Sequence, residues 1–173
     1  MEQKLKRLIA VYKLEKHVHL LGAMSPDEVR KYMEETEIYI FTSDFQEGWG
    51  AVLNEAMNSA CAVVASHAIG SVPYLLKNGQ NGMVYRNQDV EDLFSKVSYL
   101  LEHKIQRENM GRSAYCTIVQ LWNSDVAAER LLKMLEELKV YGSCDLYKDG
   151  PCSRAEIIQN DWIDHDMESR KCT

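Results

Sequence analysis

The sequence predicts an α/β fold with a Rossmann-like, doubly wound parallel sheet. Short apolar runs such as Ile38–Phe41 and Ala62–Ala65 alternate with longer segments whose apolar residues recur every three or four positions. Runs that are apolar throughout are typical of parallel strands that helices cover on both faces. Helical connections between such strands produce a parallel sheet, so the alternation along the chain predicts this architecture.

The N-terminal part is predicted to contain two helices around one strand. Apolar residues at helical spacing favour a helix over residues 1–14, and the run Val18–Leu21 favours a short strand. Ser25 and Glu28 then form the pattern of a capping box, with a proline at the first helical position. We therefore expect a second helix that continues to about Glu35.

The rest of the chain is predicted to continue the alternation and to end in a polar tail. Ala127, Leu131, Leu135 and Leu138 lie on one stripe of the last helix, which favours a core-packing face. Residues 1–140 are expected to form the domain, and residues 141–173 a tail that is poorly ordered or loosely docked, with a short helical turn near Ala155–Gln159. The other expected elements are strands at 38–41, 62–65 and 83–85, and helices at 51–60, 72–77, 90–102, 106–120 and 124–139.

Composition excludes several classes of protein. The 173 residues include 20 basic and 26 acidic ones, a net charge of -6 without a concentrated basic patch, which argues against nucleic-acid binding. The apolar runs are too short to span a bilayer and no signal peptide is recognisable, so we expect a cytoplasmic protein. Five cysteines without a Cys-x-x-Cys pair favour reduced thiols, and His17 and His19 lack the companions of a metal site.

The segment that follows the strand 38–41 has the features of an anion site beside two carboxylates. Gly48 and Gly50 precede a predicted helix, where bare backbone amides bind phosphate groups. Glu55 lies one helical turn beyond Ala51, so a carboxylate would be positioned to accept hydrogen bonds from the hydroxyls of a ribose. Glu47 precedes the glycines and could bind hydroxyls at the far end of the same ligand. Helix chemistry alone favours the alternative that these are two solvated acids near a helix start.

The wider pattern resembles the retaining glycosyltransferases of family 4, the group 1 glycosyltransferases. Glu47 and Glu55 match the E-x7-E motif of that family, with Gly48-Trp49-Gly50 between them. Further segments match in the same order over residues 1 to about 139, among them His19–Ser25, Cys61–Ser66 and Asn78–Gly82. The resemblance implies the C-terminal, donor-binding half of a GT-B enzyme that takes part in polysaccharide or glycoconjugate synthesis.

The resemblance also implies roles for individual residues. Glu55 would bind the ribose, Glu47 with the backbone of Gly48–Gly50 would hold the donor sugar, and the backbone near Met24 would meet the base. The amides of Ala51–Leu53 would face the diphosphate. Glu47 is the expected catalytic residue, and neither a metal nor another cofactor is expected. The expected nucleotide-sugar-binding residues are Met24, Glu47, Gly48, Trp49, Gly50, Ala51, Val52, Leu53 and Glu55.

The partners expected from the resemblance are a nucleotide-sugar donor and an N-terminal acceptor domain that this sequence lacks. Any association with a membrane surface would occur through that domain, and the residues present would not catalyse transfer alone. The family's first strand with its basic pair is also absent. Tyr74 replaces the usual Glu after Pro73, and Trp49 replaces the commoner Phe, more simply as a packing residue than as a stacking platform.

Two other functions compete with the donor-binding domain. The same fold could serve as a non-catalytic interaction module that forms a homodimer through the face that the missing domain would cover. A nucleotide-sugar epimerase shares the two-domain arrangement, but the E-x7-E spacing within a Gly-Trp-Gly turn argues against it.

Overall fold

The computed structural model describes residues 2–155 and 157–164. The chain divides into two compact units, residues 1–31 and 32–173, and helix α2 runs from the first into the second. The elements are α1 (Glu2–Val11), α2 (Pro26–Glu35), β1 (Ile38–Phe41), α3 (Val52–Asn58), β2 (Ala62–Ser66), α4 (Val72–Leu75), β3 (Met83–Tyr85), α5 (Val90–Glu102), α6 (Lys104–Gln120) and α7 (Ser124–Tyr141).

The first unit contains the predicted capping box. The backbone N–H and the hydroxyl of Ser25 both donate to a Glu28 carboxylate oxygen at 2.8 Å, and the Glu28 amide returns a bond to Ser25 Oγ. These hydrogen bonds lower the pKa of the Glu28 carboxyl. The prediction of a strand at Val18–Leu21 is wrong: the segment has no regular secondary structure, and no strand in the described chain pairs with it. An apolar run becomes a strand only where a ladder partner is available.

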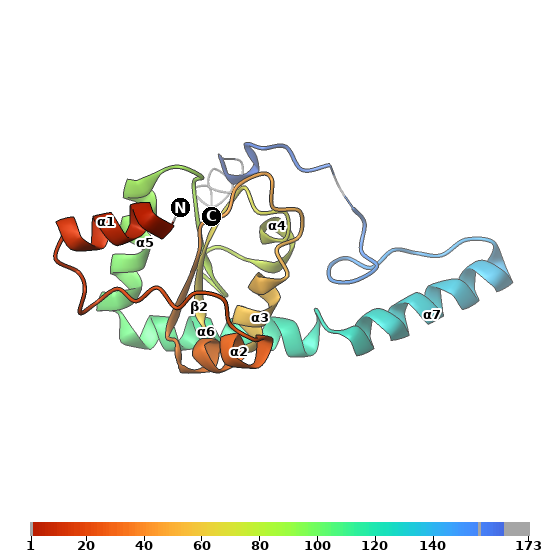
Figure 1. Cartoon of the computed structure of the whole chain (residues 1–173). Coiled ribbons are helices and arrows are strands. Elements are labelled where there is room, and N and C mark those ends of the chain that lie inside the picture. Colours follow the sequence, from red (N-terminus) through yellow and green to blue (C-terminus); the bar gives the residue numbers. More distant parts are fainter. Residues whose placement is uncertain (1, 156, 165–173) are drawn as a thin grey trace. The chain divides into compact units, whose positions relative to one another are not determined.

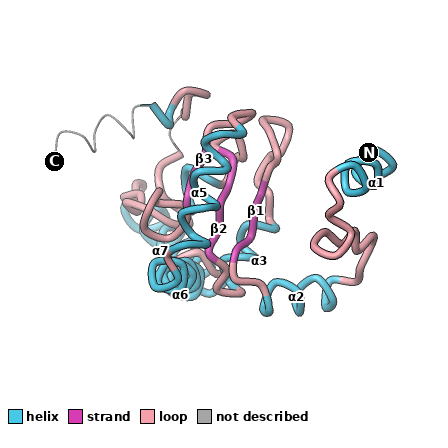
Figure 2. Tube along the Cα trace, turned by 90° about the vertical axis from the view of Figure 1, so that its left-hand side faces the viewer, coloured by secondary structure: helices cyan, strands magenta, loops and turns pink. Residues whose placement is uncertain are grey.

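The second unit is built on the predicted parallel sheet. Its three strands lie in the order β1-β2-β3, with Ile40 opposite Val64 and Val64 opposite Met83. Figure 1 shows α5 on one side of the sheet and α3 and α4 on the other, and Figure 2 shows the same arrangement from the side of α5. All five residues of β2 are buried, as two-sided coverage requires.

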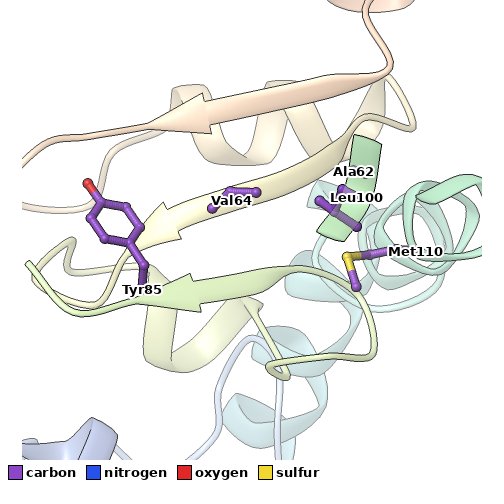
Figure 3. Close-up of a cluster of buried hydrophobic side chains, with 5 residues drawn as sticks. All are labelled: Ala62, Val64, Tyr85, Leu100 and Met110. Atoms are coloured by element: carbon purple, nitrogen blue, oxygen red, sulfur yellow. The ribbon is translucent and has the colours of Figure 1, made fainter. Parts of the chain in front are cut away.

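One face of β2 forms a hydrophobic cluster with the helices. Ala62 and Val64, two positions apart on the strand, share this face with Tyr85 from β3, Leu100 from α5 and Met110 from α6 (Figure 3). All five side chains are at least 95% buried. Burial of this kind stabilises the domain by about 25 cal/mol for each Å² of apolar surface removed from water. The cluster therefore packs α5 and α6 against β2, the strand whose following loop contacts the candidate site.

The last helix differs from its prediction. α7 has no buried residue, and the exposed fractions of Leu131, Leu135 and Leu138 are 53%, 53% and 45%. The interpretation of this stripe as a core-packing face is therefore wrong, because the described chain provides no layer that covers it. No described helix is both long and apolar enough to cross a membrane.

The described part of the tail makes side-chain contacts with the rest of the second unit. Arg130 on α7 donates to the carbonyls of Asp149 and Pro151 at 2.6 and 3.0 Å, and its guanidinium lies 4.2 Å from the ring centre of Tyr147. No helical turn forms at the described residues of 155–159, while Glu156 lies outside the described residues. The chain instead turns at residues 160 and 161 and is helical over residues 162–164.

Candidate functional site

The candidate site lies at the carboxyl end of β1, where the chain turns into α3. Gly50 makes this turn possible for two reasons. Its φ is +74°, in the left-handed region that glycine adopts without strain. A Cβ at this position would also lie 2.9 Å from Phe41 Cε1 and 3.0 Å from Ile69 Cγ2. The turn therefore packs directly against the end of the strand, the edge at which open parallel sheets bind ligands.

The turn presents a run of backbone donors without acceptors. The amides of the five residues Gly48–Val52 donate to no group in the described part of the chain. The first bonded amide is that of Leu53, which donates to the Gly50 carbonyl at 2.9 Å. The resemblance predicted that the amides of Ala51–Leu53 face the diphosphate. In the structure the amides without a partner are those of Gly48–Val52, so the open run begins three residues before the predicted one. Consecutive amides without internal partners are ready donors for an anionic ligand.

Two carboxylates lie on either side of this run. Glu47 is half-buried, and its Oε2 accepts a hydrogen bond of 3.3 Å from Ser43 Oγ. Glu55 is exposed and bonds through its side chain to none of the described residues. Burial raises the pKa of Tyr39 on β1, and the negative charge of Glu55 raises it further. Neither acid is neutralised by a described lysine or arginine.

The residues that depart from the family pattern contact each other. The rings of Trp49 and Tyr74 are stacked, with centroids 6.0 Å apart and planes at 25°. Trp49 also lies 5.7 Å from Trp122, and its indole N–H donates to Asn54 Oδ1 at 2.9 Å. Tyr74 thus supports the ring of Trp49 in the turn. Such ring pairs contribute about 0.5–1.5 kcal/mol beyond the area that they bury.

A second loop, which follows β2, packs against the back of the turn. The amide of Gly70 donates to the Glu47 carbonyl at 3.4 Å, and the amide of Ser71 donates to the Trp49 carbonyl at 3.1 Å. Gly70 is required because a Cβ there would lie 1.7 Å from the carbonyl oxygen of Gly48. The loop therefore holds the carbonyls of Glu47 and Trp49 by hydrogen bonds and packs against the Gly48 carbonyl between them.

The structure brings most of the predicted site residues together. Eight of them lie within residues 47–55 of the second unit, while Met24 is a half-buried residue of the first unit. Sequence reasoning missed Ser43, which orients Glu47, and the contacts of Gly70 with the turn. A Gly after a buried strand signals close backbone approach, but its partner becomes visible only in three dimensions.

Two hollows lie beside the loop that precedes the turn. One, of about 290 Å³, is lined by Thr42 and Asp44 and by residues that follow β3. The other, of about 220 Å³, is lined by Phe45 and His67 and by tail residues that include Trp162. Among the described residues, no group of three His, Cys, Asp or Glu side chains could hold a metal ion. The expectation that the site needs no metal stays a prediction.

Comparison with known proteins supports the resemblance. Residues 1–117 match the family described as glycosyl transferases group 1. The chain is 28% identical over 121 residues to an N,N'-diacetylbacillosaminyl-diphospho-undecaprenol alpha-1,3-N-acetylgalactosaminyltransferase of Campylobacter jejuni, covering 70% of this chain and 31% of that protein. It is 27% identical over 150 residues to the phosphatidylinositol N-acetylglucosaminyltransferase gpi3 subunit of Schizosaccharomyces pombe, covering 81% and 32% respectively. The chain thus spans about a third of the length of these relatives.

Solved structures share the fold. The C-terminal domain of a group 1 glycosyl transferase, LpcC, from Francisella tularensis aligns with a TM-score of 0.63 at 22% identity, over 69% of this chain and 60% of that one. HepE from Anabaena, solved in complex with UDP, aligns with a TM-score of 0.70 at 23% identity, over 79% of this chain and 36% of that one. The predicted C-terminal GT-B fold is confirmed. With its parallel sheet, its Gly-Trp-Gly turn and a family match over two thirds of its length, this chain belongs to the group 1 glycosyltransferases.

Proposed function

We propose that this domain binds the diphosphate of a nucleotide-sugar donor on the open amides of Gly48–Val52. The run of five unbonded donors is the observation that carries the proposal. A diphosphate presents several anionic oxygens, and each charge-assisted hydrogen bond contributes about 1.5–3 kcal/mol. Because α3 has only seven residues, the individual amides contribute more than the helix dipole.

The two carboxylates are proposed to bind the sugars at the ends of the same ligand. Glu55 is exposed and its side chain bonds to none of the residues that the structure describes, so its oxygens can accept hydrogen bonds from vicinal ribose hydroxyls. Glu47, oriented by Ser43, is proposed to hold the hydroxyls of the donor sugar and to act as the catalytic residue. Trp49 would contribute through its main chain, while its side chain packs on Tyr74.

The proposed reaction is transfer of a hexose-type sugar with retention to a saccharide, lipid or other acceptor. The bond between the anomeric carbon and the diphosphate oxygen breaks, and the diphosphate keeps the electron pair. The oxygen of an acceptor hydroxyl bonds to the anomeric carbon on the same face, and its proton passes to the departing diphosphate. The amides of the turn would stabilise that negative charge as it develops, which lowers the barrier. The proposed mechanism requires no metal ion.

Similarity to known proteins supports the donor class. HepE has been solved with UDP and with UDP-glucose, and the relatives named above are glycosyltransferases. The acceptor is proposed to bind to a separate N-terminal domain of the complete enzyme. These 173 residues alone are therefore expected to bind donor without catalysing transfer.

The test is a titration of the 173-residue chain with UDP, GDP and ADP, followed by ¹⁵N–¹H NMR and calorimetry. We expect shifts of the amides of residues 47–55, with one nucleotide preferred. Glu55→Ala should raise the dissociation constant by about tenfold to a hundredfold, the scale of a hydrogen bond to a charged group. Glu136→Ala on the exposed face of α7 removes an equal charge and is the matched control.

Shifts confined to residues outside 42–74 would refute the assignment. Equal loss of affinity in the Glu55 and Glu136 variants would show that long-range charge, and not a contact with ribose, determines binding.

The exposed face of α7 favours a second candidate function, a self-associating interaction module. Leu131, Leu132, Leu135 and Leu138 are all at least 45% exposed, and an apolar patch of this kind often marks an interface. Light scattering that gives a dimer mass, abolished by Leu132→Glu and Leu135→Glu, would support this function. A monomer that binds nucleotide would support the donor-binding domain alone.

A further inference from the structure

The C-terminal segment Asn160–Asp164 is held on the loop after β2 by several contacts. The indole N–H of Trp162 donates to the carbonyl of His67 at 3.1 Å. In return, His67 Nε2 lies 3.1 Å from the carbonyl of Asn160. Asp164 forms an ion pair with Arg86, just beyond β3. Ile163, between these anchors, is only 3% exposed. The segment therefore forms a defined contact with the carboxyl edge of the sheet.

His67 is the centre of this contact. Its Nδ1 accepts a hydrogen bond of 2.9 Å from the amide of Asn87, so the ring proton lies on Nε2 and is donated to Asn160. Phe45 packs edge-on against the ring, with centroids 5.6 Å apart. One side chain thus joins the loop after β2, the loop after β3, the loop that leads into the site, and the tail.

The loop that carries His67 also controls the orientation of the open amides. Its Gly70 and Ser71 amides hold the carbonyls of Glu47 and Trp49, and Gly70 lies against the Gly48 carbonyl. A peptide unit is planar, so a fixed carbonyl fixes the N–H of the next residue. The three carbonyls belong to the peptide units that present the N–H groups of Gly48, Trp49 and Gly50.

We propose that the segment Asn160–Asp164 is a clasp that positions the amides of Gly48, Trp49 and Gly50 for the donor diphosphate. The clasp acts through His67 and the loop that follows it, and its role in binding rests on the proposed function. Trp162 and His67 are positioning residues, because they act through the loop, and Asp164 supports them by holding the segment on Arg86. The family match ends at residue 117, so this chain uses a segment outside the matched region to support its site.

The experiment compares four variants of the 173-residue chain by ¹⁵N–¹H NMR, first without ligand and then during titration with UDP. Trp162→Phe removes the indole donor and keeps an aromatic ring. Asp164→Asn removes the charge of an ion pair whose two side chains are about half exposed, so it leaves the core intact. Asp164→Glu keeps that charge, and Ile157→Ala alters a side chain that is 90% exposed and lies three residues before the segment.

We expect Trp162→Phe and Asp164→Asn to shift the amides of Gly48, Trp49 and Gly70 before any ligand is added. Both should weaken UDP binding about threefold to tenfold, the scale of one hydrogen bond. Asp164→Glu and Ile157→Ala should retain the spectrum and the affinity of the unmodified chain.

The proposal is refuted if the chemical shifts of the turn amides are unchanged in both Trp162→Phe and Asp164→Asn. It is also refuted if these amides shift without any loss of UDP affinity. If Trp162→Phe unfolds the chain, Asp164→Asn decides the question. If the unmodified chain binds no nucleotide, the proposed function fails, and the ligand-free spectra still show whether the tail orients the turn.

Discussion

The contact between Gly70 and the turn can be tested by the addition of one methyl group. In Gly70→Ala the new Cβ would lie 1.7 Å from the Gly48 carbonyl oxygen, whereas Cβ atoms in real structures essentially never come within 3.0 Å of another heavy atom. The obstacle is backbone on both sides, so no flexible side chain can move away. The two loops would have to separate by more than an ångström.

This separation has two costs. Overpacking of a well-packed site costs about 1–3 kcal/mol. The hydrogen bonds from Gly70 and Ser71 to the turn would also lengthen or break, and each contributes about 0.5–1.5 kcal/mol. We expect the free energy of unfolding to fall by about 2–4 kcal/mol, which for a chain of this size lowers Tm by roughly 2–4 °C per kcal/mol. The displaced amides should also weaken UDP binding about tenfold or more.

Calorimetric unfolding of Gly70→Ala and Gly48→Ala provides the assay. Gly48 is the matched control, because its backbone is outside the left-handed region and its added Cβ would have no atom within 4 Å. Gly48→Ala should change the free energy of unfolding by no more than about 0.5 kcal/mol. Equal Tm values for the two variants, together with unchanged UDP affinity in Gly70→Ala, would refute the proposed coupling between the loops.

Two further predictions concern the aromatic pair and a buried thiol. A double-mutant cycle of Trp49→Ala and Tyr74→Ala, measured by urea unfolding, should give a coupling free energy of about 0.5–1.5 kcal/mol, and additivity would show that the stack contributes nothing. Burial raises the pKa of Cys61 to about 11 from 9.0, so the exposed Cys116 should react with iodoacetamide at pH 8 while Cys61 does not. Since the raised pKa favours the neutral thiol in the folded state, this stability contribution is fully present below pH 9 and is lost as the pH rises towards 11. Early modification of Cys61 in the native protein would contradict this.

Elements with strong local signals could be predicted from the sequence almost to the residue. The strands β1 and β3 have the predicted bounds because each is a compact apolar run. Helix α5 also begins and ends where expected, because the Asp89 side chain accepts the Asp92 amide at 2.9 Å and caps it locally.

Predictions that required knowledge of a distant partner were less successful. The stripe on α7 has the period of a core face, yet periodicity cannot show whether another layer covers it. The segment 18–21 similarly lacked a ladder partner. At the site, the E-x7-E spacing located the turn, but the extent of its open amides depends on tertiary contacts. The Ser43–Glu47 bond and the approach of Gly70 to Gly48 have no periodic signature.

The positions of the three tryptophans allow nucleotide binding at the site to be followed by intrinsic fluorescence. Trp49 is part of the amide run, Trp122 lies 5.7 Å from it, and Trp162 bonds to His67. Every indole in the sequence therefore lies in or beside the proposed donor site. Intrinsic fluorescence should respond to nucleotide without any attached dye, and replacing Trp162 by Phe would separate the emission of the tail from that of the turn.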